Sequence, residues 1–234
     1  DDYLADEPLH RENARLRLEL LDDTGTRPPG RLLDVGCAHG FFLDEARDAG
    51  WRVQGVEVCP GPAATARDRF GLDVAAELGD VSAHHPGTFD TVTLFQVLEH
   101  VASPVDVLRA AHACLRSSGA LVVETWDRSS PVARVMRSHW QDVAPPSVVW
   151  LFDRTSLALL LESAGFRVTE MRHATKRVSV RFVGSLLDDH GGALAPIGRA
   201  IRRSPLRDRS FLYRFGDLVT VVARPAQEAA AGAA

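Results

Sequence analysis

The sequence predicts an α/β fold: a doubly wound, Rossmann-like sheet of seven strands, mostly parallel, with an antiparallel last strand and helical lid insertions. Between residues 31 and 125, short apolar runs of strand length alternate with helical segments, which is typical of a parallel sheet with right-handed crossovers. A glycine-rich turn, Gly36–Gly40, follows the first of these runs. The length of 234 residues suits one such domain.

The individual elements are predicted from the spacing of apolar residues and from the glycines and prolines that separate them. Leu9, Leu16 and Leu20 predict an amphipathic helix over residues 9–21, and the glycines and prolines of 22–30 end it. β-branched and apolar runs predict the first strands, at 31–35, 51–56, 72–75, 89–94 and 120–125. The segments between them predict helices at 41–49, 61–70 and 104–116.

The pattern is less regular after Trp126. A helix at 154–163, a strand at 167–172 and a last strand at 218–223 are expected. Long connections in compact domains are usually lids or binding elements, so lid insertions are predicted at about 126–150 and 174–215. The second should contain short helices near 182–187 and 197–203.

These elements predict the domain organisation. Residues 1–29 form an N-terminal helical cap, residues 30–225 form the domain, and the alanine-rich residues 226–234 form a disordered tail.

Composition narrows the function classes. The net charge of −4 gives no reason to expect a nucleic-acid partner. The arginines near the C-terminus are better explained by a solvated helix face, although an acidic substrate group or a dimer contact stays open: Arg199, Arg202, Arg203, Arg207, Arg209 and Arg214. No Cys-x-x-Cys pair, signal segment or membrane-length apolar run is seen. We therefore expect a cytoplasmic monomer or homodimer with no metal, no membrane partner and a small-molecule substrate.

The glycine-rich turn indicates a ligand site. The strand Leu32–Val35 leads into Gly36-Cys37-Ala38-His39-Gly40 and then into a helix. Glycine lets the backbone approach a ligand, and a helix start offers free N–H groups. The small residues recur every second position, unlike the Gly-x-Gly-x-x-Gly spacing of dinucleotide sites. A tight turn without a ligand is the alternative.

Three later features extend the pattern. Glu57 ends the second strand, where a carboxylate can accept hydrogen bonds from ribose hydroxyls. Gly79-Asp80-Val81 reads by default as a turn. The segment Phe95-Gln96-Val97-Leu98-Glu99-His100-Val101 follows the fourth strand, and Arg116-Ser117-Ser118-Gly119 precedes the fifth.

In this order, the four motifs resemble those of class I S-adenosylmethionine-dependent methyltransferases, especially the ubiquinone-pathway-like small-molecule enzymes. The resemblance spans about residues 30–172 and the last strand. The chain departs from the family at Ala38, which replaces a glycine, and at Ser118. The resemblance implies S-adenosylmethionine as cofactor and S-adenosylhomocysteine as product. It also implies cofactor contacts at Asp34, Gly36, Cys37, Ala38, Gly40, Glu57, Val58, Asp80, Val81, Phe95 and Gln96.

The resemblance also suggests where catalysis takes place. His100 is the first candidate for the base that removes a hydroxyl proton, with a structural loop anchor as its alternative role. His139 is a second candidate base and a substrate contact. Trp140 and Tyr3 are candidate substrate contacts, and core packing is the alternative for Trp140. The acceptor is expected to be methylated on oxygen or nitrogen, with oxygen preferred.

Two other functions stay open at this point. One is an NAD-linked oxidoreductase, which the glycine spacing and the lack of a Tyr-x-x-x-Lys pair disfavour. The other is a non-catalytic regulatory protein that binds the cofactor, which Ala38 in the glycine loop slightly favours.

Overall fold

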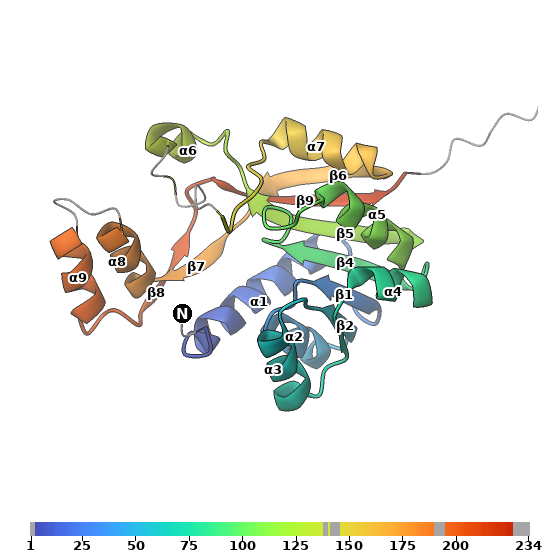
Figure 1. Ribbon diagram of the computed structural model, residues 1–234, viewed down its shortest axis with the longest axis horizontal. Coiled ribbons are helices and arrows are strands. Elements are labelled where there is room, and N and C mark those ends of the chain that lie inside the picture. Colours follow the sequence, from blue (N-terminus) through green and yellow to red (C-terminus); the bar gives the residue numbers. More distant parts are fainter. Residues whose placement is uncertain (1–2, 138–139, 141–145, 190–194, 227–234) are drawn as a thin grey trace, which may run out of the picture.

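The chain folds around one seven-stranded sheet, shown by a computed structural model that describes residues 3–137, 140, 146–189 and 195–226 (Figure 1). The strands lie in the order β3-β2-β1-β4-β5-β9-β6. They span β1 Arg31–Val35, β2 Arg52–Val56, β3 Val74–Ala75, β4 Phe89–Phe95, β5 Leu115–Trp126, β6 Phe166–His173 and β9 Leu218–Pro225.

The direction of the strands confirms the predicted sheet. Strands β1 to β5 pair in parallel, and β9 lies antiparallel between β5 and β6. Val35 pairs with both Val56 and Leu94 in register. The carboxyl ends of β1, β2 and β4 therefore meet at one edge, which is where open α/β sheets bind ligands.

Helices cover both faces of this sheet. They span α1 Glu7–Asp23, α2 Phe41–Asp48, α3 Pro60–Phe70, α4 Leu78–His84, α5 Pro104–Cys114, α6 Pro131–Met136 and α7 Arg154–Ser163. Because side chains alternate along a strand, Leu32 packs with α1, α2 and α3, while Leu33 packs with α4, α5 and α7. Each face thus has its own apolar core.

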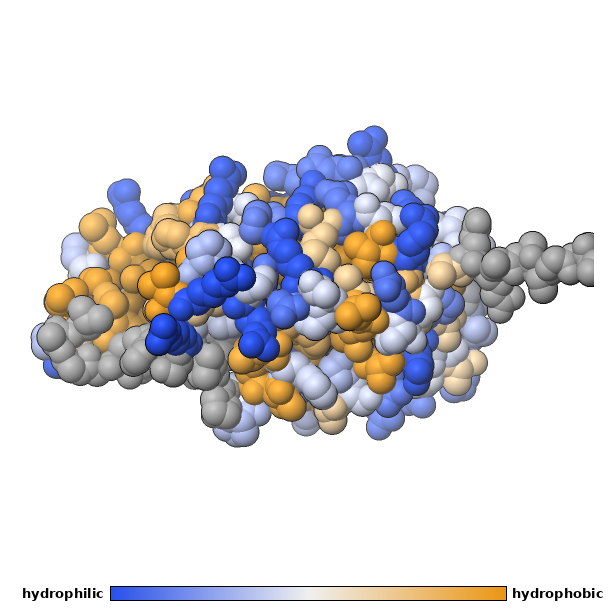
Figure 2. Space-filling view, turned by 90° about the horizontal axis from the view of Figure 1, so that it is seen from above, coloured by the Kyte–Doolittle hydropathy of each residue, from blue (hydrophilic) through white to orange (hydrophobic). Residues whose placement is uncertain are grey.

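The second segment that was predicted as a lid, residues 174–215, contains the helices of a separate lobe (Figure 1). Its helices, α8 Val180–Asp189 and α9 Ala195–Arg203, contain both helices expected there. A Cβ on Gly198 would lie 2.5 Å from the carbonyl oxygen of Gly184, so the two backbones cross at a contact that needs glycine. Hydrophobic side chains are exposed at this end of the molecule, among them Ile197 and Leu206 (Figure 2).

The structure corrects three expectations. Strands β7 Lys176–Ser179 and β8 Ser210–Tyr213 form a two-stranded sheet that was not predicted, because their pairing is distant in sequence. Gly79-Asp80-Val81 lies in helix α4 rather than in a turn. Strand β5 begins at Leu115, five residues before the expected start, since Leu115 pairs with Phe89 ahead of a register shift.

Two further features bear on the expected setting of the chain. Within the described residues, no helix is long and apolar enough to cross a membrane. The tail from residue 227 onward, expected to be disordered, lies outside the described residues.

Candidate functional site

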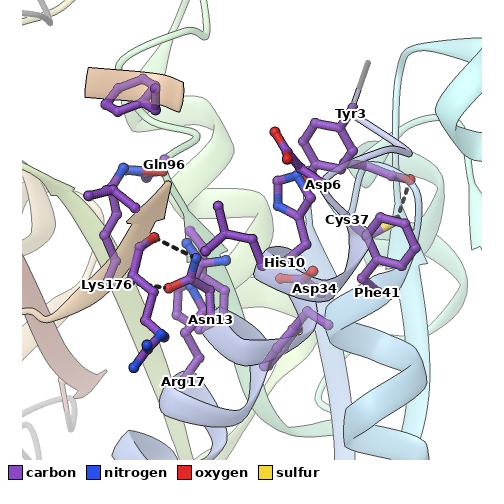
Figure 3. Close-up of a pocket in the computed structure, with 18 of the residues that line it drawn as sticks. Tyr3, Asp6, His10, Asn13, Arg17, Asp34, Cys37, Phe41, Gln96 and Lys176 are labelled. Atoms are coloured by element: carbon purple, nitrogen blue, oxygen red, sulfur yellow. Dashed lines mark hydrogen bonds between the residues drawn. The ribbon is translucent and has the colours of Figure 1, made fainter. Parts of the chain in front are cut away.

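A cleft of about 480 Å³ lies at the carboxyl edge of the sheet. Figure 3 shows Tyr3, Cys37 and Phe41 on one side of it and Gln96 and Lys176 on the other. Its lining comes from α1, the glycine loop, the end of β4, β7 and α8. It includes eight of the residues that the sequence analysis selected: Tyr3, Asp34, Gly36, Cys37, Ala38, Phe95, Gln96 and His100.

The glycine loop is held by close contacts. Gly36 and Gly40 both have positive φ angles, of 76° and 84°. A Cβ on Gly36 would lie 2.6 Å from Cγ2 of Val97, and one on Gly40 would lie 2.6 Å from Cδ1 of Leu72. Both positions therefore require glycine for conformation and for space.

Ala38 departs from the motif and takes up a left-handed conformation. Its φ angle is 48°, which strains a residue that carries a Cβ. The Ala38 amide donates to Oε2 of Glu57 at 2.9 Å, and the Cys59 amide donates to Oε1 of Glu57 at 2.8 Å. Glu57 thus fixes the glycine loop and keeps further acceptor lone pairs on both carboxylate oxygens.

Asp34 lies at the bottom of the cleft and is only 4% exposed. Its Oδ1 accepts a hydrogen bond of 2.6 Å from the hydroxyl of Thr93. Burial raises the pKa of Asp34 to about 7, against the lowering effects of Thr93 and Arg17. A bound cation would stabilise the ionised form of a carboxyl group in this buried environment.

The other predicted cofactor residues lie along the same edge, outside the cleft lining. Glu57 and the exposed Val58 follow β2, and Gly40 is buried at the start of α2. In α4, which follows β3, Asp80 is exposed and Val81 is buried. These positions continue the row from β1 across β2 to β3, as a nucleoside on this edge would require.

Gln96 follows β4 and is strained. Its φ angle is 59°, and its backbone N–H donates to the carbonyl of Glu124 at 2.7 Å. The side-chain Nε2 is buried and has no hydrogen-bond partner among the described residues. Strain and an unmet donor together are typical of residues that are shaped for a ligand.

Glu99 and His100 differ in exposure and contacts. Glu99 is buried, its Oε2 accepts from the hydroxyl of Thr125 at 2.8 Å, and burial raises its pKa. His100 is exposed, and its Nδ1 lies 2.6 Å from the carbonyl oxygen of Ser147. Because a carbonyl only accepts, Nδ1 carries the proton and Nε2 keeps a lone pair.

The N-terminal cap closes one side of the cleft. The ring of Tyr3 stacks on His10 at 3.8 Å and on His39 of the glycine loop at 4.7 Å between centroids. Burial lowers the pKa of His10 to about 4, so its imidazole is neutral near pH 7. Burial also raises the pKa of Tyr3.

Ion pairs hold α1 against the sheet side of the cleft. Arg11 lies 2.8 Å from both Asp44 and Glu45 of α2. Arg17 pairs with the buried Glu124 at 2.6 Å and stacks over Phe95, 4.3 Å from the ring centroid.

Several lining residues were not identified from the sequence. Asn13 and Arg17 are four residues apart on one helix face, which places them together but does not reveal that the face meets the sheet edge. Lys176 and Arg177 lie on the unpredicted strand β7. The single signal available was that Lys176 is the only lysine in the chain.

Trp140 does not line the cleft. It is 4% exposed, packs against Trp126, and its Nε1 donates to Asp217 at 3.1 Å. These contacts match core packing, the role that was named as the alternative for Trp140. His139, the second candidate base, lies outside the described residues.

Within the described part of the chain, no three His, Cys, Asp or Glu side chains are grouped to hold a metal ion. Asp188 of the lobe pairs with Arg199 and Arg202, at 2.9 and 3.2 Å, and Asp208 pairs with Arg207 at 3.2 Å. Three arginines of the basic cluster therefore have acidic partners.

Comparison with known proteins identifies relatives of the chain. The profile of a methyltransferase-domain family matches residues 5–171. A ubiquinone biosynthesis O-methyltransferase of Xanthomonas campestris is 27% identical over 190 residues, covering 72% of this chain and 79% of that protein. One from Pseudomonas aeruginosa is 31% identical over 128 residues, 52% of this chain and 55% of that protein.

Solved structures share the fold. A methyltransferase of Thermotoga maritima, described as a possible histamine N-methyltransferase, matches with a TM-score of 0.61 and 19% identity, covering 96% of this chain and 95% of that one. A putative methyltransferase of Haloferax volcanii, solved with the Trm112 activator, matches with a TM-score of 0.68 and 15% identity over 96% and 94% of the two chains. At such identities the likeness concerns the fold alone.

Proposed function

Since the chain belongs to the class I S-adenosylmethionine-dependent methyltransferases, we propose that it methylates a hydroxyl oxygen of a small molecule in the cleft between the glycine loop and β7. Relatives named O-methyltransferases support oxygen as the acceptor atom. The family membership leaves the NAD-linked alternative without support.

The residues at the sheet edge fit the cofactor. The Gly36 and Gly40 backbones leave no room for a Cβ, Asp34 offers a buried carboxylate for a cationic group, and Arg17 offers a cation for a carboxylate. Glu57 would accept ribose hydroxyls, and Asp80 and Val81 would meet the adenine. When bound, S-adenosylmethionine supplies an activated methyl group on a sulfonium.

The chain itself must orient the hydroxyl and take its proton. One observation carries this role for His100: the residue lines the cleft, and the hydrogen bond to the Ser147 carbonyl places the proton of the neutral imidazole on Nδ1, which leaves the lone pair on Nε2. Nε2 of His100 would take the hydroxyl proton of the acceptor as its oxygen is methylated. The same hydrogen bond anchors the loop at Ser147, so both roles predicted for His100 are compatible.

Substitution of His100 tests this function. In His100→Ala, kcat for the hydroxyl acceptor should fall by about 10²–10⁴-fold, the usual contribution of a positioned base. Calorimetry should show unchanged affinity for S-adenosylhomocysteine, because His100 lies on the acceptor side. Acceptors are found by transfer of a radiolabelled methyl group to a panel of phenols and amines.

His84 provides a matched control. It is exposed, and its Nδ1 also contacts a backbone carbonyl, that of Asp80 at 2.7 Å, but it lies outside the cleft lining. His84→Ala should keep the full rate. Equal rates in both variants would remove His100 from the reaction, and methyl transfer to amines alone would overturn the oxygen acceptor.

Glu57→Ala tests the cofactor site separately. Loss of charged hydrogen bonds to the ribose should weaken binding of S-adenosylhomocysteine by about 1–3 kcal/mol. Unchanged affinity in calorimetry would mean that the ribose is held elsewhere.

A further inference from the structure

The wall of the cleft opposite the glycine loop is strand β7. Asn13 of α1 fixes its backbone: Nδ2 donates to the Arg177 carbonyl at 3.0 Å, and the Arg177 amide donates to Oδ1 at 2.7 Å. The Arg177 guanidinium lies 2.8 Å from Glu12, also on α1. Three contacts therefore hold β7 in place, so a side chain on this strand can act as a defined recognition element.

Lys176 brings a positive charge to this wall. It lines the cleft and is half-buried, and its ammonium lies 4.4 Å from the ring centroid of Trp126. The aromatic face stabilises the cation where water is partly excluded. Lys176 lies close enough to His10 to disfavour a second positive charge on that imidazole.

Three acids near this wall have arginine partners. Asp6 pairs with Arg181, Glu12 with Arg177 at 2.8 Å, and Glu124 with Arg17 at 2.6 Å. The repulsion that these three acids exert on an approaching anion is therefore largely offset. Asp34 lies on the other side of the cleft, beneath the glycine loop.

A second donor lies on the same side of the cleft (Figure 3). The side-chain amide nitrogen of Gln96, Nε2, is buried and has no hydrogen-bond partner among the described residues, and Gln96 lines the cleft. A buried donor without a partner lowers the stability of the fold. An oxygen atom of a ligand would remove that cost.

Apolar side chains also line the cleft: Leu9, Phe95, Val178 and Phe182. Aromatic side chains favour flat, apolar ligands through stacked and edge contacts. The cleft therefore offers apolar contact surface beside the Lys176 ammonium and the Gln96 side-chain amide.

We propose that the methyl acceptor is a hydroxylated aromatic carboxylic acid whose carboxylate binds the Lys176 ammonium, with Gln96 donating to one of its oxygens. The ring lies against Phe95 and Val178, and the hydroxyl reaches His100. This inference rests on the proposed function, because it assigns the acceptor class to the same cleft.

The test compares acids with their neutral amides. Protocatechuate and caffeate hold the carboxylate at two distances from the hydroxyls, and the primary amide of each has the same shape without the charge. Each probe is titrated calorimetrically into the chain saturated with S-adenosylhomocysteine. At least one acid should bind about tenfold or more tightly than its amide.

Two variants locate the effect. Lys176→Met should abolish the preference for the acid and leave amide binding unchanged, whereas Lys176→Arg, which keeps the charge, should retain it. Gln96→Glu should weaken binding of the acid more than that of the amide. Thermal melts and S-adenosylhomocysteine affinity report whether each variant is folded with an intact cofactor site.

The outcomes separate this inference from the proposed function. If neither acid binds, if acids and amides bind equally, or if Lys176→Met keeps the preference, the inference is wrong. If the unmodified chain binds no S-adenosylhomocysteine, the proposed function fails instead.

Discussion

Several single residues at the sheet edge have backbone conformations or surroundings that lower the stability of the fold. Ala38 and Gln96 have left-handed backbones without being glycines, and Asp34 is a buried acid. Such features persist where a ligand gains from them. The cofactor-side positions should therefore show opposite effects of substitution on folding and on binding.

Asp34→Asn should stabilise the cofactor-free chain. Because folding raises the pKa of Asp34 from 3.8 to about 7, the folded chain keeps a proton that the unfolded chain loses in this window. The contribution of Asp34 to the free energy of unfolding therefore falls as the pH rises from about 4 to 7. At pH 8 the variant should gain about 1–3 kcal/mol in the free energy of unfolding, measured by urea denaturation.

The same substitution should weaken cofactor binding, since the carboxylate no longer faces a cationic group. At pH 4 the two chains should have nearly equal stability. A gain in stability that is independent of pH would contradict the assignment of the buried charge.

Ala38→Gly should relieve the strain of the glycine loop. The left-handed conformation costs a non-glycine residue about 1–2 kcal/mol, whereas glycine adds about 0.5–1 kcal/mol of chain entropy to the cost of folding. The free energy of unfolding should therefore rise by up to about 1 kcal/mol. Gly40→Ala, whose Cβ would lie 2.6 Å from Leu72, should lower it. A destabilised Ala38→Gly variant would mean that the methyl group is needed for packing.

At the scale of elements, helix α1 joins the two sides of the cleft. It contacts α2 through Arg11, β5 through Arg17 and β7 through Asn13. The sequence predicts an amphipathic helix at this position. It does not predict that the polar face of the helix is the one that builds the site.

Arg11→Ala should loosen α1 from α2. Arg11 is 22% exposed and pairs with Glu7, Asp44 and Glu45, whereas Arg15 is 62% exposed and pairs with Glu45. The free energy of unfolding should fall by about 1–2 kcal/mol for Arg11→Ala and by clearly less for the exposed Arg15→Ala. The cofactor KM should rise in the first variant only, and equal effects would contradict the role of this network.

At the scale of the whole molecule, we expect the sheet and the lobe to bind different ligands. The predicted cofactor residues lie at the carboxyl ends of β1, β2 and β4 and on α4, whereas the proposed acceptor wall belongs to β7 and depends on the lobe behind it (Figure 1). Disturbing the lobe should therefore affect the acceptor more than the cofactor.

Gly198→Ala tests this division. The added Cβ would lie 2.5 Å from the Gly184 carbonyl oxygen, so α8 and α9 must move apart. The acceptor KM should rise at least about tenfold, while the affinity for S-adenosylhomocysteine stays within about twofold (tenfold being 1.4 kcal/mol). The matched control is Gly61→Ala in α3, where no atom lies within 4 Å of the added Cβ. Equal loss of both ligands would show that the lobe and the sheet do not act separately.

The sequence by itself determined the sheet, the glycine loop and the family, because these depend on local signals: strand-length apolar runs, small residues at fixed spacing and acids at strand ends. It also singled out His100. Tertiary structure alone decided that Arg17, Asn13 and Lys176 meet in one cleft and that Trp140 packs away from it. Those placements depend on contacts between segments that are distant in the sequence, such as Asn13 with Arg177, for which a single sequence carries no periodic signal.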